Sequence, residues 1–312
     1  LDLLKPLGAS GDPSGDRSRS GHTTYGRDPM STATINDGII ANVRSEAKDR
    51  LQQRRVEAIW DQMRADKLDA LVIGGRGLLT QYGFLEYVAG FCPQVRLCYA
   101  VVTPDEQPVL VMPTASDAWY ARQATHLVDV RVAGQGDVIS DSDGLPPVIA
   151  QVLQQRKAAT GTIGMVGLQH IIPAMDYAQL REELPQASFV DGTATVGRVK
   201  AIKSAEEQQE VLRSCAIADA GLQVFMDRAR AGSTGWELWG EVQREVRSRG
   251  ARDVLIMVSS DPYFNDTPRN EPIAQGDLVC TYVEISGPNG YWVEKASLFA
   301  VGDISDAKRR IA

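Results

Sequence analysis

The sequence predicts a protein of the α/β class, in the broad sense that includes α+β arrangements, with two domains in its 312 residues. Two observations carry this prediction. As far as about residue 195, short apolar runs bounded by glycine or proline alternate with amphipathic stretches, which is typical of a sheet covered by helices. Beyond that point, two stretches open with the helix-start pattern S/T-x-x-E, and a long hairpin pattern follows them. A chain of this length can bury two separate cores.

Residues 1–37 are expected to form an extension outside the folded domains, either disordered or non-native. The first 29 residues are rich in Gly, Ser, Asp and Arg and have almost no apolar periodicity, which is typical of disorder. Met30, followed by STATINDG, would make a natural translation start, so the residues before it are interpreted as upstream or non-native sequence.

The first predicted domain, residues 38–195, opens with a helix over about 43–66. One face of that helix is apolar at positions i, i+3, i+4 and i+7, namely Val56, Ile59, Trp60 and Met63. The run LDALVIGG then indicates a buried strand, and CYAVVT and QPVLVMP flank a turn and predict a hairpin. Further strands are expected at VRVAG, TIGMVG and SFVDG, with helices over Pro146–Lys157 and Ala174–Leu184.

The second predicted domain, residues 196–312, opens with two capped helices. Ser204 with Glu207 and Thr234 with Glu237 each fit a capping box. An apolar stripe on the first helix is expected to pack on the core: Val211, Cys215, Ala218, Leu222 and Phe225. The run VLIMVSS indicates a buried strand, and a last helix is expected to begin at Ser305, just before the sequence stops.

A hairpin is predicted at residues 276–302, GDLVCTYVEISGPNGYWVEKASLFAVG, with its turn at 286–290. Alternation places Tyr282 and Glu284 on one face, and if Tyr282 lies opposite Glu294, all three side chains are neighbours. Two adjacent carboxylates can raise one another's pKa and act as acid and base, or they can hold a hard cation. The alternative is that both glutamates point into solvent.

Composition narrows the range of functions. Because the net charge is −7 and the pI is near 5.1, binding to nucleic acid or to an anionic membrane surface is not expected. The four cysteines are scattered without a CxxC pair, so they are interpreted as thiols in a reducing, cytoplasmic compartment. Histidine occurs three times and never beyond residue 170, which limits histidine-based chemistry in the second domain.

Three stretches resemble a known family. The family's N-terminal domain is similar to the stretch RRVEAIWDQMRADKLDALVIGG together with EYVAGF. Its domain junction is similar to VGRVKAIKSAEEQQEVLRSCAIADAG, and its first catalytic hairpin is similar to the hairpin at residues 276–302. The family is that of creatinase and aminopeptidase P, the Xaa-Pro peptidase or M24 family. The resemblance covers roughly residue 54 to the end. It implies a creatinase-type N-terminal α/β domain followed by an incomplete, C-terminally truncated pita-bread catalytic domain.

The hairpin departs from the metallopeptidase branch of that family. In that branch the two strands supply two metal-binding aspartates, whereas the matching positions here are Tyr282 and Glu294. A tyrosine is a poor ligand for a dinuclear centre. The branch also has a catalytic histidine before the hairpin, and its position falls at Phe264 or Asn265. The departure is similar to creatinase, which works without metal and has a glutamate at the position of Glu294.

The resemblance therefore implies a metal-independent hydrolase that cleaves a C–N bond in a small amidino or amide compound. Glu294 would hold the cationic part of the substrate, and Glu284 or Tyr282 would assist proton transfer. Asn265 is a further candidate for substrate binding. By analogy with creatinase, Arg96 would hold a substrate carboxylate in the active site of a second copy, so a homodimer is expected.

The sequence is also compatible with two other functions. One is a proline-specific aminopeptidase or dipeptidase, acting on short peptides, with a variant site for two divalent ions, manganese or zinc, around Glu284 and Glu294. The other is a catalytically inactive pita-bread domain that serves binding or dimerisation. In every version the 312-residue chain alone is expected to be inactive and prone to aggregation, with the stripe around Phe225 and one sheet edge partly uncovered.

Overall fold

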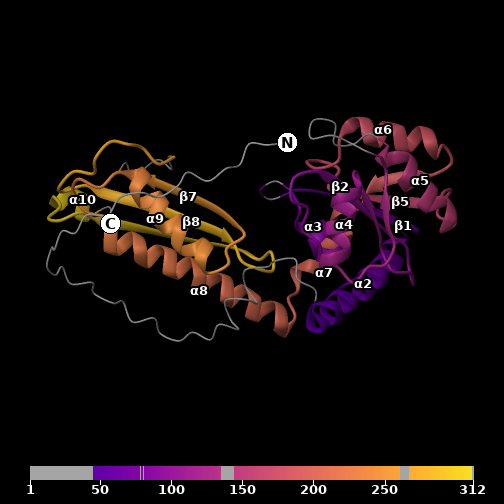
Figure 1. Cartoon of the computed structure of the whole chain (residues 1–312), viewed down its shortest axis with the longest axis horizontal. Coiled ribbons are helices and arrows are strands. Elements are labelled where there is room, and N and C mark those ends of the chain that lie inside the picture. The colour runs from indigo at the N-terminus through magenta and orange to yellow at the C-terminus, as the bar shows by residue number, and fades with distance from the viewer. Residues whose placement is uncertain (1–44, 78, 80, 135–143, 261–266, 311–312) are drawn as a thin grey trace, which may run out of the picture.

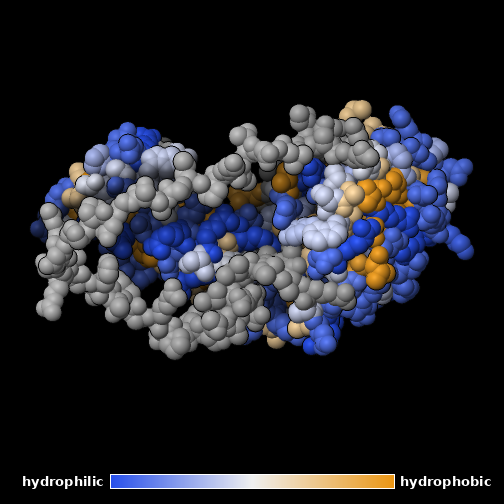
Figure 2. All heavy atoms as spheres, in the orientation of Figure 1, coloured by the Kyte–Doolittle hydropathy of each residue, from blue (hydrophilic) through white to orange (hydrophobic). Residues whose placement is uncertain are grey.

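A computed structural model describes residues 45–77, 79, 81–134, 144–260 and 267–310. The chain folds into an N-terminal α/β domain and a second domain of helices and a hairpin sheet, which lie side by side along the long axis (Figure 1). On the face seen in Figure 2, hydrophilic side chains predominate over the second domain, and hydrophobic ones show mainly on the N-terminal domain. The expected N-terminal extension, residues 1–37, lies outside the described residues.

The N-terminal domain is built on a six-stranded mixed sheet with strand order β4-β3-β2-β1-β5-β6. Strand β2 runs antiparallel to β1 and β3, so the predicted hairpin is confirmed, while the other neighbouring strands pair in parallel. All the predicted strands are present: β1 Ala70–Arg76, β2 Leu97–Val102, β3 Val109–Met112, β4 Val130–Val132, β5 Thr162–Val166 and β6 Ser188–Asp191.

Helices cover both faces of this sheet. On one face lie α2 (Glu46–Asp66), α3 (Gly83–Ala89), α4 (Ala115–Ala124) and α7 (Thr193–Ala201), and on the other lie α5 (Leu145–Gln155) and α6 (Ala174–Glu183). The predicted face of α2 is confirmed, because Val56, Ile59 and Met63 are buried. The sequence patterns did not indicate α4 or α7. The boundary expected at residue 195 falls inside α7, whose Val196 is buried in the N-terminal core.

The second domain pairs two helices with a three-stranded antiparallel sheet of order β7-β8-β9. The capping boxes of both helices are formed, and Ser305 caps the last helix as predicted. The elements are α8 Ala205–Arg228, α9 Gly235–Ser248, β7 Asp253–Ser259, β8 Leu278–Ser286, β9 Trp292–Ala300 and α10 Asp306–Arg309.

The buried face of α8 differs from the predicted stripe. Ala218 and Phe225 are buried, but Val211, Cys215 and Leu222 are only half-buried; the rest of the buried face is Glu207, Ser214, Ile217 and Gly221. Position 221 of this face is occupied by glycine, and a larger residue would not fit, because a Cβ there would come within 2.6 Å of Val246 on α9. The stripe around Phe225 is thus partly uncovered, as expected, but Phe225 itself is fully buried, with its ring 5.2 Å from that of Phe299 on β9.

The four cysteines are free thiols, two buried and two half-buried. Among the described residues, no helix is both long enough and apolar enough to cross a membrane.

Candidate active site

The candidate site lies on one face of the three-stranded sheet. Helices α8 and α9 pack on the other face, where Val279, Val283 and Ile285 of β8 are buried (Figure 1). Because side chains alternate along a strand, Tyr282 and Glu284 of β8 and Glu294 of β9 all lie on the face away from the helices. The sequence prediction that these three residues share a face is therefore confirmed. We call this surface the open face.

The register of the hairpin corrects one detail of that prediction. Glu294 lies directly opposite Glu284, whereas Tyr282 lies opposite Ala296 and not opposite Glu294. The reason is the turn: the last pair of the ladder is Ser286 with Trp292, so the connection spans residues 287–291 and shifts the register by two. A shift of two keeps every side chain on its face.

The two glutamates differ in their surroundings. Glu284 is half-buried on the central strand, and Glu294 is exposed on the edge strand. Burial, and then the negative charge of Glu294, raise the pKa of Glu284 above its ordinary value. The pair thus combines one carboxyl that takes up a proton more readily with a second one, Glu294, that is exposed to solvent, as the alternative expectation had it for this residue.

The donor atoms of this face do not by themselves form a dinuclear metal site. Within the described part of the chain, no group of three or more His, Cys, Asp or Glu side chains could hold a metal ion. The open face supplies two carboxylates and the phenol of Tyr282, and a phenol with a pKa near 10 is a weak ligand for hard divalent ions. Asn265 and Phe264, at the position of the family's histidine, lie outside the described residues.

Arg96 lies in the other domain, directly before β2. Its guanidinium Nη1 is 3.1 Å from Oδ2 of Asp117 on α4, and the two side chains are about one fifth exposed, at 21% and 20%. The Nε atom of Arg96 is buried without a hydrogen-bond partner among the described residues. The structure therefore brings together the three hairpin residues, and it holds Arg96 in an ion pair of its own domain.

A polar junction, which the sequence patterns did not indicate, fixes the hairpin against the N-terminal domain. Arg55 on α2 donates to Glu207 on α8 at 2.8 Å and to Tyr291, next to β9, at 2.5 Å. The hydroxyl of Tyr291 in turn donates to Glu207 at 2.8 Å. No local signal could have shown these contacts, because Arg55 and Tyr291 are 236 residues apart.

A second contact of the junction is a buried ion pair. Arg252, directly before β7, donates to both carboxylate oxygens of Glu86 on α3, at 2.6 and 2.7 Å. Tyr82, at the start of α3, also donates to Asp253 at the start of β7. Burial alone would raise the pKa of Glu86, but the Arg252 guanidinium holds it below the ordinary value. The ends of β7 and β8 nearest the glutamate pair are thereby held in place.

Comparison with known proteins identifies relatives of both domains. Residues 55–202 match the creatinase/prolidase N-terminal domain family. A protein of Sinorhizobium fredii named as an uncharacterized hydrolase/peptidase is 27% identical over 272 residues, which cover 83% of this chain and 67% of that protein.

Among solved structures, the prolidase of Pyrococcus horikoshii superposes with a TM-score of 0.64 at 17% identity, over 83% of this chain and 68% of that one. A zinc-substituted E. coli aminopeptidase P in complex with product superposes with a TM-score of 0.64 at 18% identity, over 86% of this chain and 66% of that one. These similarities show that the fold is shared across both domains.

Proposed function

We propose that this chain is a hydrolase of the creatinase and prolidase family, and that it hydrolyses a C–N bond in a small amidino or amide compound without a divalent metal centre. The match of residues 55–202 to the creatinase/prolidase N-terminal domain and the similarity to the S. fredii protein support this proposal. The observation that carries this proposal is the position of Glu284 directly opposite Glu294 on the open face. Side chains directly opposite in an antiparallel pair have Cβ atoms about 5 Å apart, so one substrate group can contact both carboxylates.

The roles follow from the surroundings of each residue. Glu294 is exposed and is proposed to bind the cationic amidino group through a charge-assisted hydrogen-bonded pair. Glu284, whose pKa is raised by burial and by the charge of Glu294, is proposed to deliver a proton to the leaving nitrogen. Tyr282, two residues along the same strand, supplies a hydroxyl on the same face that can assist this transfer.

Arg96 is proposed to bind a substrate carboxylate in the active site of a second copy. Its present partner is Asp117 of its own chain, so this role requires a substrate carboxylate to replace or share that ion pair. The proposal implies a homodimer, which a mass measurement in solution tests directly.

A second candidate function is that of an Xaa-Pro peptidase with a variant metal site. The similarity to solved prolidase and aminopeptidase P structures, and the hydrolase/peptidase name of the S. fredii relative, favour it. In that case Glu284 and Glu294 would hold divalent ions that polarise the scissile carbonyl, together with ligands from outside the described residues.

The test is a substrate screen of the full-length protein, followed by Glu294→Gln on the compound that is turned over. The panel contains creatine, cyclic amidines, simple amides and Xaa-Pro dipeptides. We expect turnover of an amidino or amide compound, and a fall in kcat/KM of about 100-fold in Glu294→Gln, because a neutral amide cannot replace a charge-assisted pair. Glu241→Gln serves as the control and should retain full activity, because Glu241 is a half-buried glutamate on α9 that pairs with Arg244, away from the open face.

Turnover of Xaa-Pro dipeptides alone would favour the peptidase. Absence of turnover on the whole panel by a folded dimer would favour a binding module, and an active Glu294→Gln variant would remove Glu294 from the mechanism.

A further inference from the structure

An apolar side chain stands next to the glutamate pair on the open face. Leu255 of β7 lies directly opposite Glu284, which lies directly opposite Glu294, so the three residues form one row across the sheet. Leu255 is on the open face, because Ile256, the next residue, is buried in the core under α8 and α9. Side chains directly opposite one another have Cβ atoms about 5 Å apart. Leu255 is 36% exposed, so a ligand bound at the pair can contact it.

The rows on either side of this one add further apolar and aromatic groups. On one side, Met257, Tyr282 and Ala296 lie opposite one another across the three strands. On the other side, Trp292 precedes Glu294 by two residues and therefore shares its face. Met257, Tyr282 and Trp292 are half-buried. Because residues two apart along a strand are separated by about 7 Å, a group held at Glu294 lies close to aromatic rings.

No basic side chain of the sheet balances the charge of the two glutamates. The structure describes every residue of β7, β8 and β9, and the one basic residue among them is Lys295. Lys295 lies on the face covered by the helices, where it pairs with Asp219 on α8 at 2.9 Å. Neither glutamate has a hydrogen bond or ion pair with a described residue. The neighbouring charge that acts on the Glu284 carboxyl is that of Glu294, which raises its pKa.

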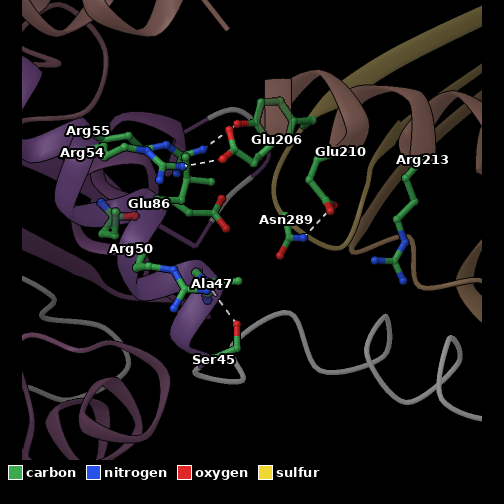
Figure 3. A pocket seen from close by; sticks show the side chains of 15 residues that line it. Ser45, Ala47, Arg50, Arg54, Arg55, Glu86, Glu206, Glu210, Arg213 and Asn289 are labelled. Atoms are coloured by element: carbon green, nitrogen blue, oxygen red, sulfur yellow. Dashed lines mark hydrogen bonds and ion pairs between the residues drawn. The ribbon is translucent and has the colours of Figure 1, made fainter. Parts of the chain in front are cut away.

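The carboxylates of the domain junction differ in this respect, because they have partners within the chain. A cleft of about 580 Å³ lies there, where α2, α8 and the β8–β9 turn meet (Figure 3). In it, Glu206 pairs with Arg54 at 2.8 Å, and Glu210 accepts a hydrogen bond from Asn289 at 2.6 Å. A cationic ligand therefore gains more from the carboxylates of the open face than from those of the cleft.

We propose that the open face selects amidino compounds whose cationic group carries an apolar substituent, and that Leu255 and Met257 determine this specificity. The inference rests on the cation-binding role proposed for Glu294. The amidinium group lies at Glu294, near the ring of Trp292, and aromatic faces attract organic cations. Leu255 lies two strands from Glu294, about 10 Å away, and a phenyl ring on the amidinium group covers this span. A bare amidinium group leaves the apolar side chains exposed to water.

Three compounds separate the charge of the ligand from its apolar part: acetamidine, benzamidine and benzamide. Acetamidine and benzamidine are both cations at neutral pH and differ in a methyl against a phenyl group. Benzamide keeps the ring and is neutral. Binding of each compound to the full-length protein is measured by titration calorimetry at constant ionic strength. We expect benzamidine to bind about tenfold more tightly than acetamidine, because its ring buries apolar surface, and about tenfold more tightly than benzamide, because it is charged.

Variants of the open face assign the two contributions to residues. Leu255→Ala and Met257→Ala should each weaken benzamidine binding severalfold and leave acetamidine binding unchanged, because acetamidine does not reach them. Glu294→Gln should weaken the binding of both cations. Met226→Ala is the matched control, because Met226 is an apolar side chain of α8 that is 51% exposed and lies on the other side of the sheet. Thermal unfolding of each variant shows whether its fold is retained.

The comparison of the three compounds on the unmodified protein decides the proposal even if a variant fails to fold. Equal binding of acetamidine and benzamidine, or of benzamide and benzamidine, would overturn it. An unchanged affinity ratio in both folded alanine variants would overturn it as well. If acetamidine binding still depends on Glu294 in those cases, the proposed hydrolase function stands without this selectivity. Tight benzamidine binding that depends on Leu255, without turnover of any compound, would support the inference and count against the proposed hydrolysis.

Discussion

At the scale of single residues, the central feature is a pair of like charges that face one another across two strands. Such a pair destabilises a hairpin when both members are ionised. Glu284 and Glu294 lie in this arrangement on the open face, and the pKa of Glu284 is raised by burial and by its neighbour. A cationic substrate group would relieve the repulsion, which is consistent with the role proposed for Glu294.

The raised pKa of Glu284 makes stability depend on pH in a defined direction. The Glu284 carboxyl holds its proton more tightly in the folded state than in the unfolded chain. Its contribution to the free energy of unfolding is therefore fully present below the ordinary pKa of 4.5 and is lost as the pH rises through the raised pKa of the folded state. We expect Glu284→Gln to remove this pH-dependent loss. Between pH 4 and pH 7, the free energy of unfolding of the variant should therefore rise, relative to that of the unmodified protein, by no more than about 1 kcal/mol.

Urea unfolding of the protein and the variant across pH 4 to 7 measures the effect. A parallel pH dependence in both would contradict the assignment, and Glu241→Gln provides the control for a generic loss of negative charge.

Residue patterns in the sequence predicted the shared face but not the register. Alternation alone places Tyr282, Glu284 and Glu294 on one side of the hairpin. The pairing of Glu284 with Glu294 depends on how many residues the turn uses, and the run SGPNGY admits more than one choice. The three-dimensional structure fixes the number of turn residues, because its last strand pair is Ser286 with Trp292.

At the scale of elements, the β8–β9 turn connects the candidate site to the N-terminal domain. Gly290 has a φ of +80° and lies against the buried ion pair, because a Cβ there would come within 2.2 Å of Oε2 of Glu86 and 2.9 Å of Nη2 of Arg252. Glycine is required at this position both for its backbone conformation and for the close approach.

Substitution of Gly290 separates these two requirements. Gly232 has a similar φ of +90°, and a Cβ added there would meet no described atom within 4 Å, so Gly232→Ala should cost about 1 kcal/mol for the conformation alone. We expect Gly290→Ala to cost about 1–3 kcal/mol more, because it also displaces the hydrogen bonds between Glu86 and Arg252. Denaturant unfolding of both variants gives the difference, and equal losses would show that the ion pair tolerates the methyl group.

Helix-start patterns predicted α8, α9 and α10 because a cap is a local signal within four residues. Apolar periodicity did not indicate α4, which has few large apolar residues on its buried face and uses Ala118, Ala121 and Ala124 there. The predicted domain boundary fell inside α7, since a loop and a short helix with glycine look alike in sequence.

At the scale of the whole molecule, long-range ion pairs fix how the two domains meet. Glu86 with Arg252 and Arg55 with Glu207 are buried or nearly so, with side-chain exposures between 3% and 14%. Buried pairs of this kind add little net stability compared with apolar replacements, but losing one partner costs about 3–5 kcal/mol. We infer that these two pairs help to specify one orientation of the hairpin against the N-terminal domain. Their members are 152 and 166 residues apart, so no pattern in the sequence could indicate them.

The carboxylate pair of the open face is proposed to serve hydrolysis without divalent ions. Metal analysis of the full-length protein, combined with turnover before and after a chelator, tests this proposal most directly. We expect far less than one divalent ion per chain and an unchanged rate after chelation. About two ions per chain, with activity that is lost on chelation and restored by manganese or zinc, would contradict it.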